Sequence, residues 1–112
     1  MTDRKDDLVY VEDMLLAIDR INRYRKDIDK ITFFNNEMLQ DAIVRNIEII
    51  GEAASKLSEA FTKSHPDIEW RTIIAVRNRL IHAYDTIDYQ IVWDAISTDI
   101  PVLENKLRQL LR

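Results

Sequence analysis

Apolar residues recur at steps of three and four along four long stretches of the chain. This spacing gathers them on one face of an α-helix, so it predicts amphipathic helices rather than strands. The predicted helices cover residues 6–29, 37–62, 68–84 and 89–111. Short connections between such helices favour antiparallel neighbours, and we therefore expect an all-α bundle of four to five helices. No repeat or linker interrupts residues 1–112, which predicts a single domain.

Several residues mark where these helices should start or bend. Asn35 or Asn36 can cap the second helix, and Asp88 can cap the fourth. Pro101 falls inside the fourth helix, where its missing N–H predicts a kink or a split. Gly51 lies inside the second helix, where glycine costs about 1 kcal/mol relative to alanine. We expect another helix to approach closely at that glycine.

Composition narrows the classes of protein that fit. The chain has 112 residues, 46% of them hydrophobic, which is enough apolar material for one core. It has no cysteine, which excludes disulfides and thiolate zinc sites. No apolar run approaches the roughly 20 residues that span a bilayer, and the charged N-terminus does not resemble a signal peptide. We therefore expect a cytoplasmic protein that does not enter a membrane.

The net charge of −4 argues against broad, charge-driven binding of nucleic acid. A local basic cleft is still compatible with it, because residues 71–84 of the third predicted helix carry three arginines and no acid. Two stripes run along this helix. The polar stripe consists of Arg71, Ala75, Asn78 and His82. The neighbouring, mostly apolar stripe consists of Trp70, Ile74, Arg77, Ile81 and Tyr84. The remaining apolar positions, which we expect to face the core, are Ile73, Val76 and Leu80.

Arg77 is unusual on its stripe. An ionised guanidinium among apolar neighbours is costly unless it is paired or meets an anion. One interpretation is structural: the side chain reaches the surface, or it pairs with Glu48 or Glu52 of the second predicted helix. The other interpretation is that Arg77 binds an anionic substrate.

The chain has two histidines. His65 precedes the third predicted helix, and we expect it to be an exposed loop residue. His82 lies one turn after Asn78, which can hydrogen-bond to the imidazole and fix its orientation. In that arrangement His82 could exchange protons near neutral pH. The structural alternative is a surface histidine that simply satisfies its hydrogen bonds.

These residues together resemble a known family. Residues 77–84, RNRLIHAY, match the Arg-x4-His-x-Tyr signature of HEPN-domain toxins, specifically the HepT-like group. Residues 45–54, RNIEIIGEAA, look like the group's second recurrent block, and residues 70–74, WRTII, look like its lead-in to the signature. The resemblance covers nearly the whole chain.

The resemblance implies a helical bundle that forms a two-fold homodimer, with the two signatures facing each other in a cleft. It also implies a metal-independent endoribonuclease that needs no cofactor, acts on RNA and serves as a toxin. Its partner would be a minimal nucleotidyltransferase antitoxin, which transfers AMP to the signature tyrosine, here Tyr84.

The chemistry gives each signature residue a hypothetical role. Arg77 binds the scissile phosphate, and His82 is the general acid or base. Asn78 orients His82 or contacts the phosphate, Arg79 binds the RNA backbone, and Tyr84 positions RNA and is the modification site. Arg77 and His82 are about 140° apart around a helix axis, so two copies of the chain would complete one cleft better than one.

Two other interpretations stay open at this point. HEPN-like bundles can also act as non-catalytic modules that bind nucleotides or dock partners. The chain could also be a helical dimerisation adaptor, in which Arg77 pairs with Glu48 or Glu52 and the cleft has only a structural role.

Overall fold

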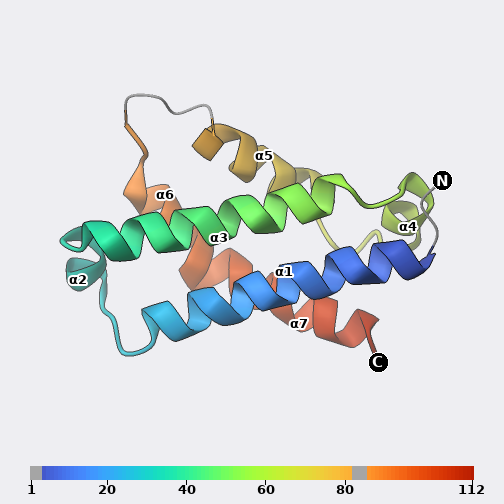
Figure 1. Ribbon diagram of the computed structural model, residues 1–112, viewed down its shortest axis with the longest axis horizontal. Coiled ribbons are helices and arrows are strands. Elements are labelled where there is room, and N and C mark those ends of the chain that lie inside the picture. The colour runs from blue at the N-terminus through green and yellow to red at the C-terminus, as the bar shows by residue number, and fades with distance from the viewer. Residues whose placement is uncertain (1–3, 82–85) are drawn as a thin grey trace.

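The computed structural model describes residues 4–81 and 86–112, and every regular element among them is a helix (Figure 1). The elements are α1 (Arg4–Arg25), α2 (Lys30–Phe34), α3 (Glu37–Ser55), α4 (Glu59–Ser64), α5 (Trp70–Ile81), α6 (Tyr89–Asp94), the π-helix η1 (Ala95–Asp99) and α7 (Ile100–Leu110). The expected all-α bundle is confirmed.

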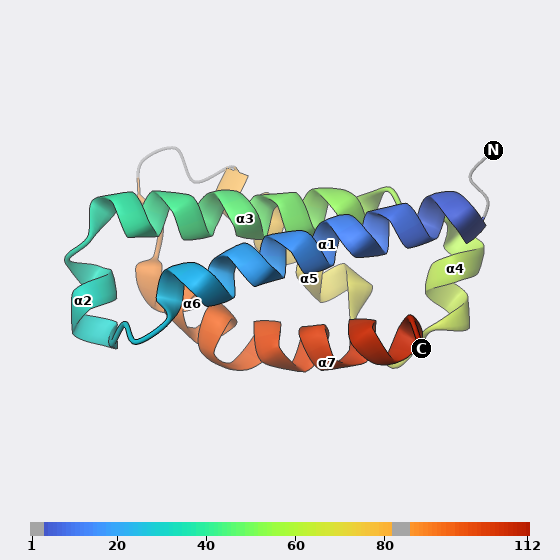
Figure 2. The same cartoon turned by 60° about the horizontal axis from the view of Figure 1, so that its bottom comes forward.

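The bundle is built around the antiparallel pair α1 and α3, which lie side by side along their length in both views (Figures 1 and 2). Helix α5 packs against α3, and the continuous run α6, η1 and α7 closes the bundle behind α1. The fully buried side chains that join these helices include Val11, Met14, Ile18, Ile21, Phe33, Ile43, Ile50, Val92, Ile96 and Leu107. The apolar faces predicted from the sequence therefore meet in one core.

The caps expected from the sequence lie at the helix starts. The side chain of Asn36 accepts a hydrogen bond from the N–H of Leu39 at 3.0 Å, and it begins α3. Asp88 accepts a hydrogen bond from the N–H of Gln90 at 3.0 Å and begins α6. Each side chain satisfies an N–H that the helix itself leaves free. The third predicted helix, residues 68–84, corresponds to α5, which runs from Trp70 to Ile81 in the described part of the chain.

A short helix, α2, forms where the sequence pattern predicts an interruption after a first helix of residues 6–29. The first helix instead ends at Arg25, and Asp27 then adopts a positive φ of 61° that turns the chain. Asp29 caps α2 by accepting a hydrogen bond from the N–H of Thr32 at 2.8 Å. That bond lowers the pKa of Asp29 from its ordinary 3.8. Phe33 of α2 is fully buried, so tertiary packing holds a helix too short to be periodic.

The single helix predicted over residues 37–62 is wrong, because the chain breaks between α3 and α4. Ser58 begins α4, and its hydroxyl accepts a hydrogen bond from the N–H of Phe61 at 3.2 Å. The buried carboxylate of Asp7 in α1 accepts hydrogen bonds from the Ser58 N–H at 2.8 Å and from its hydroxyl at 2.7 Å. A residue distant in sequence therefore stabilises this break.

Pro101 interrupts the last predicted helix as expected, and it does so through the π-helix η1. The N–H of Ile100 reaches back to the carbonyl of Ala95, and the next bond of that pattern would start from the N–H that Pro101 lacks. Its acceptor would be the carbonyl of Ile96. Arg25 of α1 supplies the donor instead, from Nη1 to the Ile96 oxygen at 2.8 Å.

Candidate functional site

Helices α3 and α5 approach each other closely at Gly51. A Cβ added there would overlap the Cβ of Arg77, and it would lie 2.6 Å from the Arg77 Cγ. It would also come within 3.4 Å of the carbonyl oxygen of Ile73. The close approach expected at this glycine is therefore confirmed, and the side chain that crosses it is the arginine of the signature.

The head of Arg77 is paired with Glu52, the residue after this glycine. Arg77 Nη1 lies 3.0 Å from Glu52 Oε2, and the Arg77 side chain is 15% exposed against 55% for Glu52. The Nε of Arg77 is buried and has no hydrogen-bond partner in the described structure. Of the two acids that the sequence offered as partners, the structure places Glu52 rather than Glu48 at Arg77.

The other polar residues of the signature that the structure describes lie at the surface. Asn78 and Arg79 are exposed on α5, as are Arg71 and Ala75. Leu80 is buried, and Ile73 and Val76 pack against the core from partly buried positions, as the sequence predicts. Helix α5 therefore turns one arginine of the signature inward and leaves its amide and second arginine at the surface.

His82 and Tyr84 lie outside the described residues, and their roles stay predictions.

His65 is less exposed than the sequence analysis expected of a loop residue. Its ring stands 4.7 Å from that of Phe61, and its backbone carbonyl accepts a hydrogen bond from the indole of Trp70 at 3.2 Å. The His65 side chain is half-buried rather than exposed, because it packs over the end of α4.

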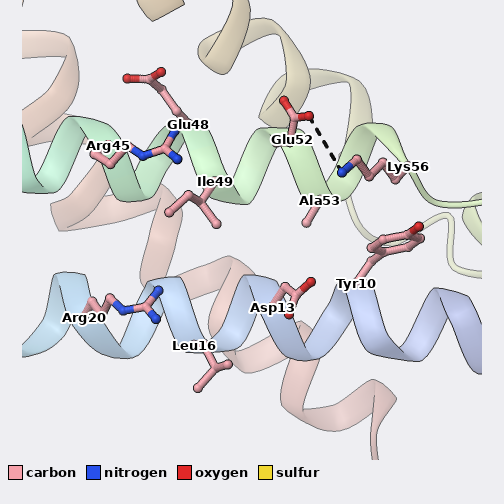
Figure 3. Close-up of a pocket in the computed structure, with 10 residues that line it drawn as sticks. All are labelled: Tyr10, Asp13, Leu16, Arg20, Arg45, Glu48, Ile49, Glu52, Ala53 and Lys56. Atoms are coloured by element: carbon pink, nitrogen blue, oxygen red, sulfur yellow. Dashed lines mark ion pairs between the residues drawn. The ribbon is translucent and has the colours of Figure 1, made fainter.

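Next to the α3–α5 contact, a groove of about 500 Å³ runs between α1 and α3 (Figure 3). Its charged lining residues are Asp13, Arg20, Arg45, Glu48, Glu52 and Lys56. Glu52 therefore belongs both to this groove and to the arginine contact. Its Oε1 lies 3.9 Å from the Nζ of Lys56, which in turn stands 6.0 Å from the ring of Tyr10. The sequence did not indicate this groove, because it combines residues from two helices.

The described part of the chain holds neither a metal-ligand cluster nor a membrane-spanning helix. Across residues 4–81 and 86–112, no three His, Asp or Glu side chains are grouped as metal ligands would be. No helix in the same part of the chain is both long and apolar enough to cross a bilayer.

Comparison with known proteins gives consistent matches over nearly the whole chain. The family described as ribonuclease HepT-like matches residues 14–110. A probable ribonuclease HepT of Thermococcus cleftensis is 37% identical over 101 residues, which cover 90% of this chain and 92% of that protein. A putative RNase of Methanocaldococcus jannaschii is 33% identical over 93% of this chain and 95% of its own length. A putative RNase of Caldanaerobacter subterraneus is 34% identical over 92% of each chain. No solved structure gives a significant match.

Proposed function

Because this chain belongs to the HepT-like ribonuclease family, we propose that it is a metal-independent endoribonuclease that cleaves RNA with Arg77 and His82. The observation that carries the proposal is the placement of Arg77. Its stem is fixed against Gly51, and its head is held by Glu52 at 3.0 Å. A cation fixed before the substrate arrives stabilises a phosphate effectively, because it needs no reorganisation during the reaction.

In the proposed reaction, the 2′-oxygen of the RNA bonds to the adjacent phosphorus while the bond from phosphorus to the 5′-oxygen breaks. A general base takes the proton of the 2′-hydroxyl, and a general acid gives a proton to the leaving 5′-oxygen. His82 fills one of these roles, and Arg77 stabilises the charge on the phosphate oxygens. The products are a 2′,3′-cyclic phosphate and a 5′-hydroxyl.

A homodimer is part of the proposal. One chain offers one His82, whereas the reaction needs a base and an acid. A two-fold axis through the cleft would bring a second His82 and a second Arg77 to the same substrate. It would also gather the arginines of two α5 helices, which supports RNA binding by a protein with a net charge of −4. The exposed Asn78 and Arg79 are available there to contact the phosphate and the RNA backbone.

We further propose that the protein is the toxin of a toxin–antitoxin pair, and that a minimal nucleotidyltransferase antitoxin silences it by AMPylating Tyr84. In the proposed dimer, AMP on this tyrosine would place an anion beside the two Arg77 side chains and oppose the approach of RNA. Incubation with the cognate transferase and ATP should add one AMP to the intact mass. An adduct that persists in Tyr84→Phe would refute the site.

The central test is cleavage of single-stranded RNA in the presence of EDTA. Wild type should cleave, whereas Arg77→Ala and His82→Ala should lose most of the activity. The cyclic phosphate end is identified by mass. A strict need for a divalent metal, or wild-type rates in either variant, would contradict the mechanism.

A non-catalytic module that binds nucleotides or docks a partner is the second candidate. The Arg77–Glu52 ion pair is the observation that favours this module, because it gives the arginine a structural partner. Expression in bacteria separates the two functions. Growth arrest that His82→Ala relieves favours the nuclease, and equal growth of both strains favours the module.

A further inference from the structure

Two adjacent residues of α3 contact Arg77 at opposite ends of its side chain. Gly51 leaves room for the Cβ and Cγ of the arginine, and Glu52 holds its Nη1. The Arg77 side chain is therefore held at its stem, where it leaves α5, and at its guanidinium. The consecutive Gly-Glu pair places these two contacts on the same turn of one helix.

The carboxylate of Glu52 is itself held in place. Its Oε2 accepts from Arg77 at 3.0 Å, while its Oε1 faces the ammonium of Lys56 at 3.9 Å. A carboxylate between two cations has fewer free orientations than one that contacts a single cation. Figure 3 shows Glu52 and Lys56 joined across one turn of α3, above the groove that α1 completes.

Arg77 depends on this one carboxylate in the described structure. Its side chain is 15% exposed and its Nε is buried without a hydrogen-bond partner in the described structure, so the ion pair with Glu52 compensates for its burial. A guanidinium that loses such a partner is an uncompensated, partly buried charge, and it moves toward water. Because Nε is buried, a phosphate can meet Arg77 only through its Nη groups, and the Glu52 contact sets their direction.

We propose that Glu52 is a positioning residue, which aims the Nη groups of Arg77 at the scissile phosphate. This inference rests on the proposed ribonuclease function. Glu52 acts through Arg77 and does not contact the RNA. A neutral acceptor at this position would keep the hydrogen bond, whereas a methyl group would remove it.

The kinetic test compares Glu52→Ala, Glu52→Gln and a matched control, Glu48→Ala. Glu48 is an acid on the same helix, one turn earlier, and it lines the same groove. We expect Glu52→Ala to lower kcat roughly 10- to 100-fold with KM changed less than about 3-fold, as for a misplaced catalytic group. Glu52→Gln should recover most of kcat, and Glu48→Ala should match wild type. Thermal unfolding of all three variants checks that a change in kcat does not come from loss of the fold.

Two kinetic outcomes would overturn the proposal. Equal kcat values for Glu52→Ala and Glu48→Ala would mean that Arg77 does not need the carboxylate. A higher rate in Glu52→Ala would mean that Glu52 competes with the phosphate for Arg77. In either case, wild-type cleavage that still depends on His82 leaves the ribonuclease function intact.

A second readout needs no activity. The guanidinium ¹H–¹⁵N signals of Arg77 are assigned by their loss in Arg77→Lys, and they report whether rotation of the guanidinium is restricted. Glu52→Ala should broaden or shift them, whereas Glu52→Gln should change them less and Glu48→Ala should leave them unchanged. Unchanged signals in Glu52→Ala would overturn the positioning role. Failure of the proposed function appears separately, as absence of RNA cleavage by wild type.

Discussion

The stem of Arg77 occupies the space that a side chain at Gly51 would need between α3 and α5. Any side chain at position 51 would therefore overlap the Cβ of the arginine. The overlap is with the root of the Arg77 side chain rather than with its flexible end. The arginine cannot move aside by changing rotamer, and α5 itself would have to shift. The spacing of the two helices and the location of the proposed phosphate-binding group are therefore set by one contact.

Gly51→Ala should destabilise the protein although alanine is the better helix former. Helix propensity alone would add about 1 kcal/mol to the free energy of unfolding. Overpacking costs about 1–3 kcal/mol, and an overlap with a Cβ that no rotamer change can relieve belongs at the upper end of that range, so we expect a net loss of about 2 kcal/mol in urea unfolding. RNA cleavage should fall as well, because Arg77 is displaced.

The double variant Gly51→Ala/Arg77→Ala sharpens this prediction. Alanine at 77 keeps the Cβ, so it should not rescue the stability lost through the alanine at 51. A Gly51→Ala protein as stable as wild type would show that the helices separate without cost.

Asp7→Ala should destabilise the corner between α3 and α4. The Asp7 side chain is buried, and its carboxylate accepts two hydrogen bonds from Ser58. Their loss leaves the Ser58 N–H without its acceptor, and we expect about 2–3 kcal/mol less stability in urea unfolding. Ser58→Ala removes only the hydroxyl bonds and should cost about 1 kcal/mol. Glu12→Ala, an exposed acid on the same helix, is the control and should be nearly neutral.

Arg25 and Pro101 should be energetically coupled although they belong to different helices. Arg25→Ala leaves the Ile96 carbonyl without its donor and should cost about 1–3 kcal/mol. Pro101→Ala supplies a backbone N–H near that carbonyl, so the Arg25→Ala penalty should be smaller in a Pro101→Ala protein. A double-mutant cycle by denaturant unfolding measures the coupling. Strict additivity of the two changes would argue against this explanation of the π-helix.

The cap of α2 should weaken in acid. The hydrogen bond from the Thr32 N–H lowers the pKa of Asp29 below 3.8 in the folded protein. A carboxyl group with a lowered folded pKa contributes stability above its unfolded pKa and loses it as pH falls through the folded value. The stability difference between wild type and Asp29→Ala should therefore be present at neutral pH and shrink below about pH 4. A difference that stays constant into strong acid would contradict this assignment.

The sequence alone determined the helical class, the capped starts of α3 and α6, and the close approach at Gly51. These features depend on local rules: apolar spacing, side-chain caps and the absence of a Cβ. It also identified Arg77 as a charge that needs a partner, and it named Glu48 and Glu52 as candidates beside an anionic substrate. Two acids one turn apart share a helix face, so no local rule could choose between them.

Only the tertiary structure made that choice, and it also decided where the helix predicted over residues 37–62 breaks. The register of α5 on α3 is set where the stem of Arg77 crosses Gly51, and this register places Glu52 at the guanidinium. Asp7 stabilises the break at Ser58 from 51 residues away, and Arg25 donates to the Ile96 carbonyl of the π-helix from 71 residues away. Such contacts depend on which faces meet in three dimensions, and the one-dimensional pattern does not record that pairing.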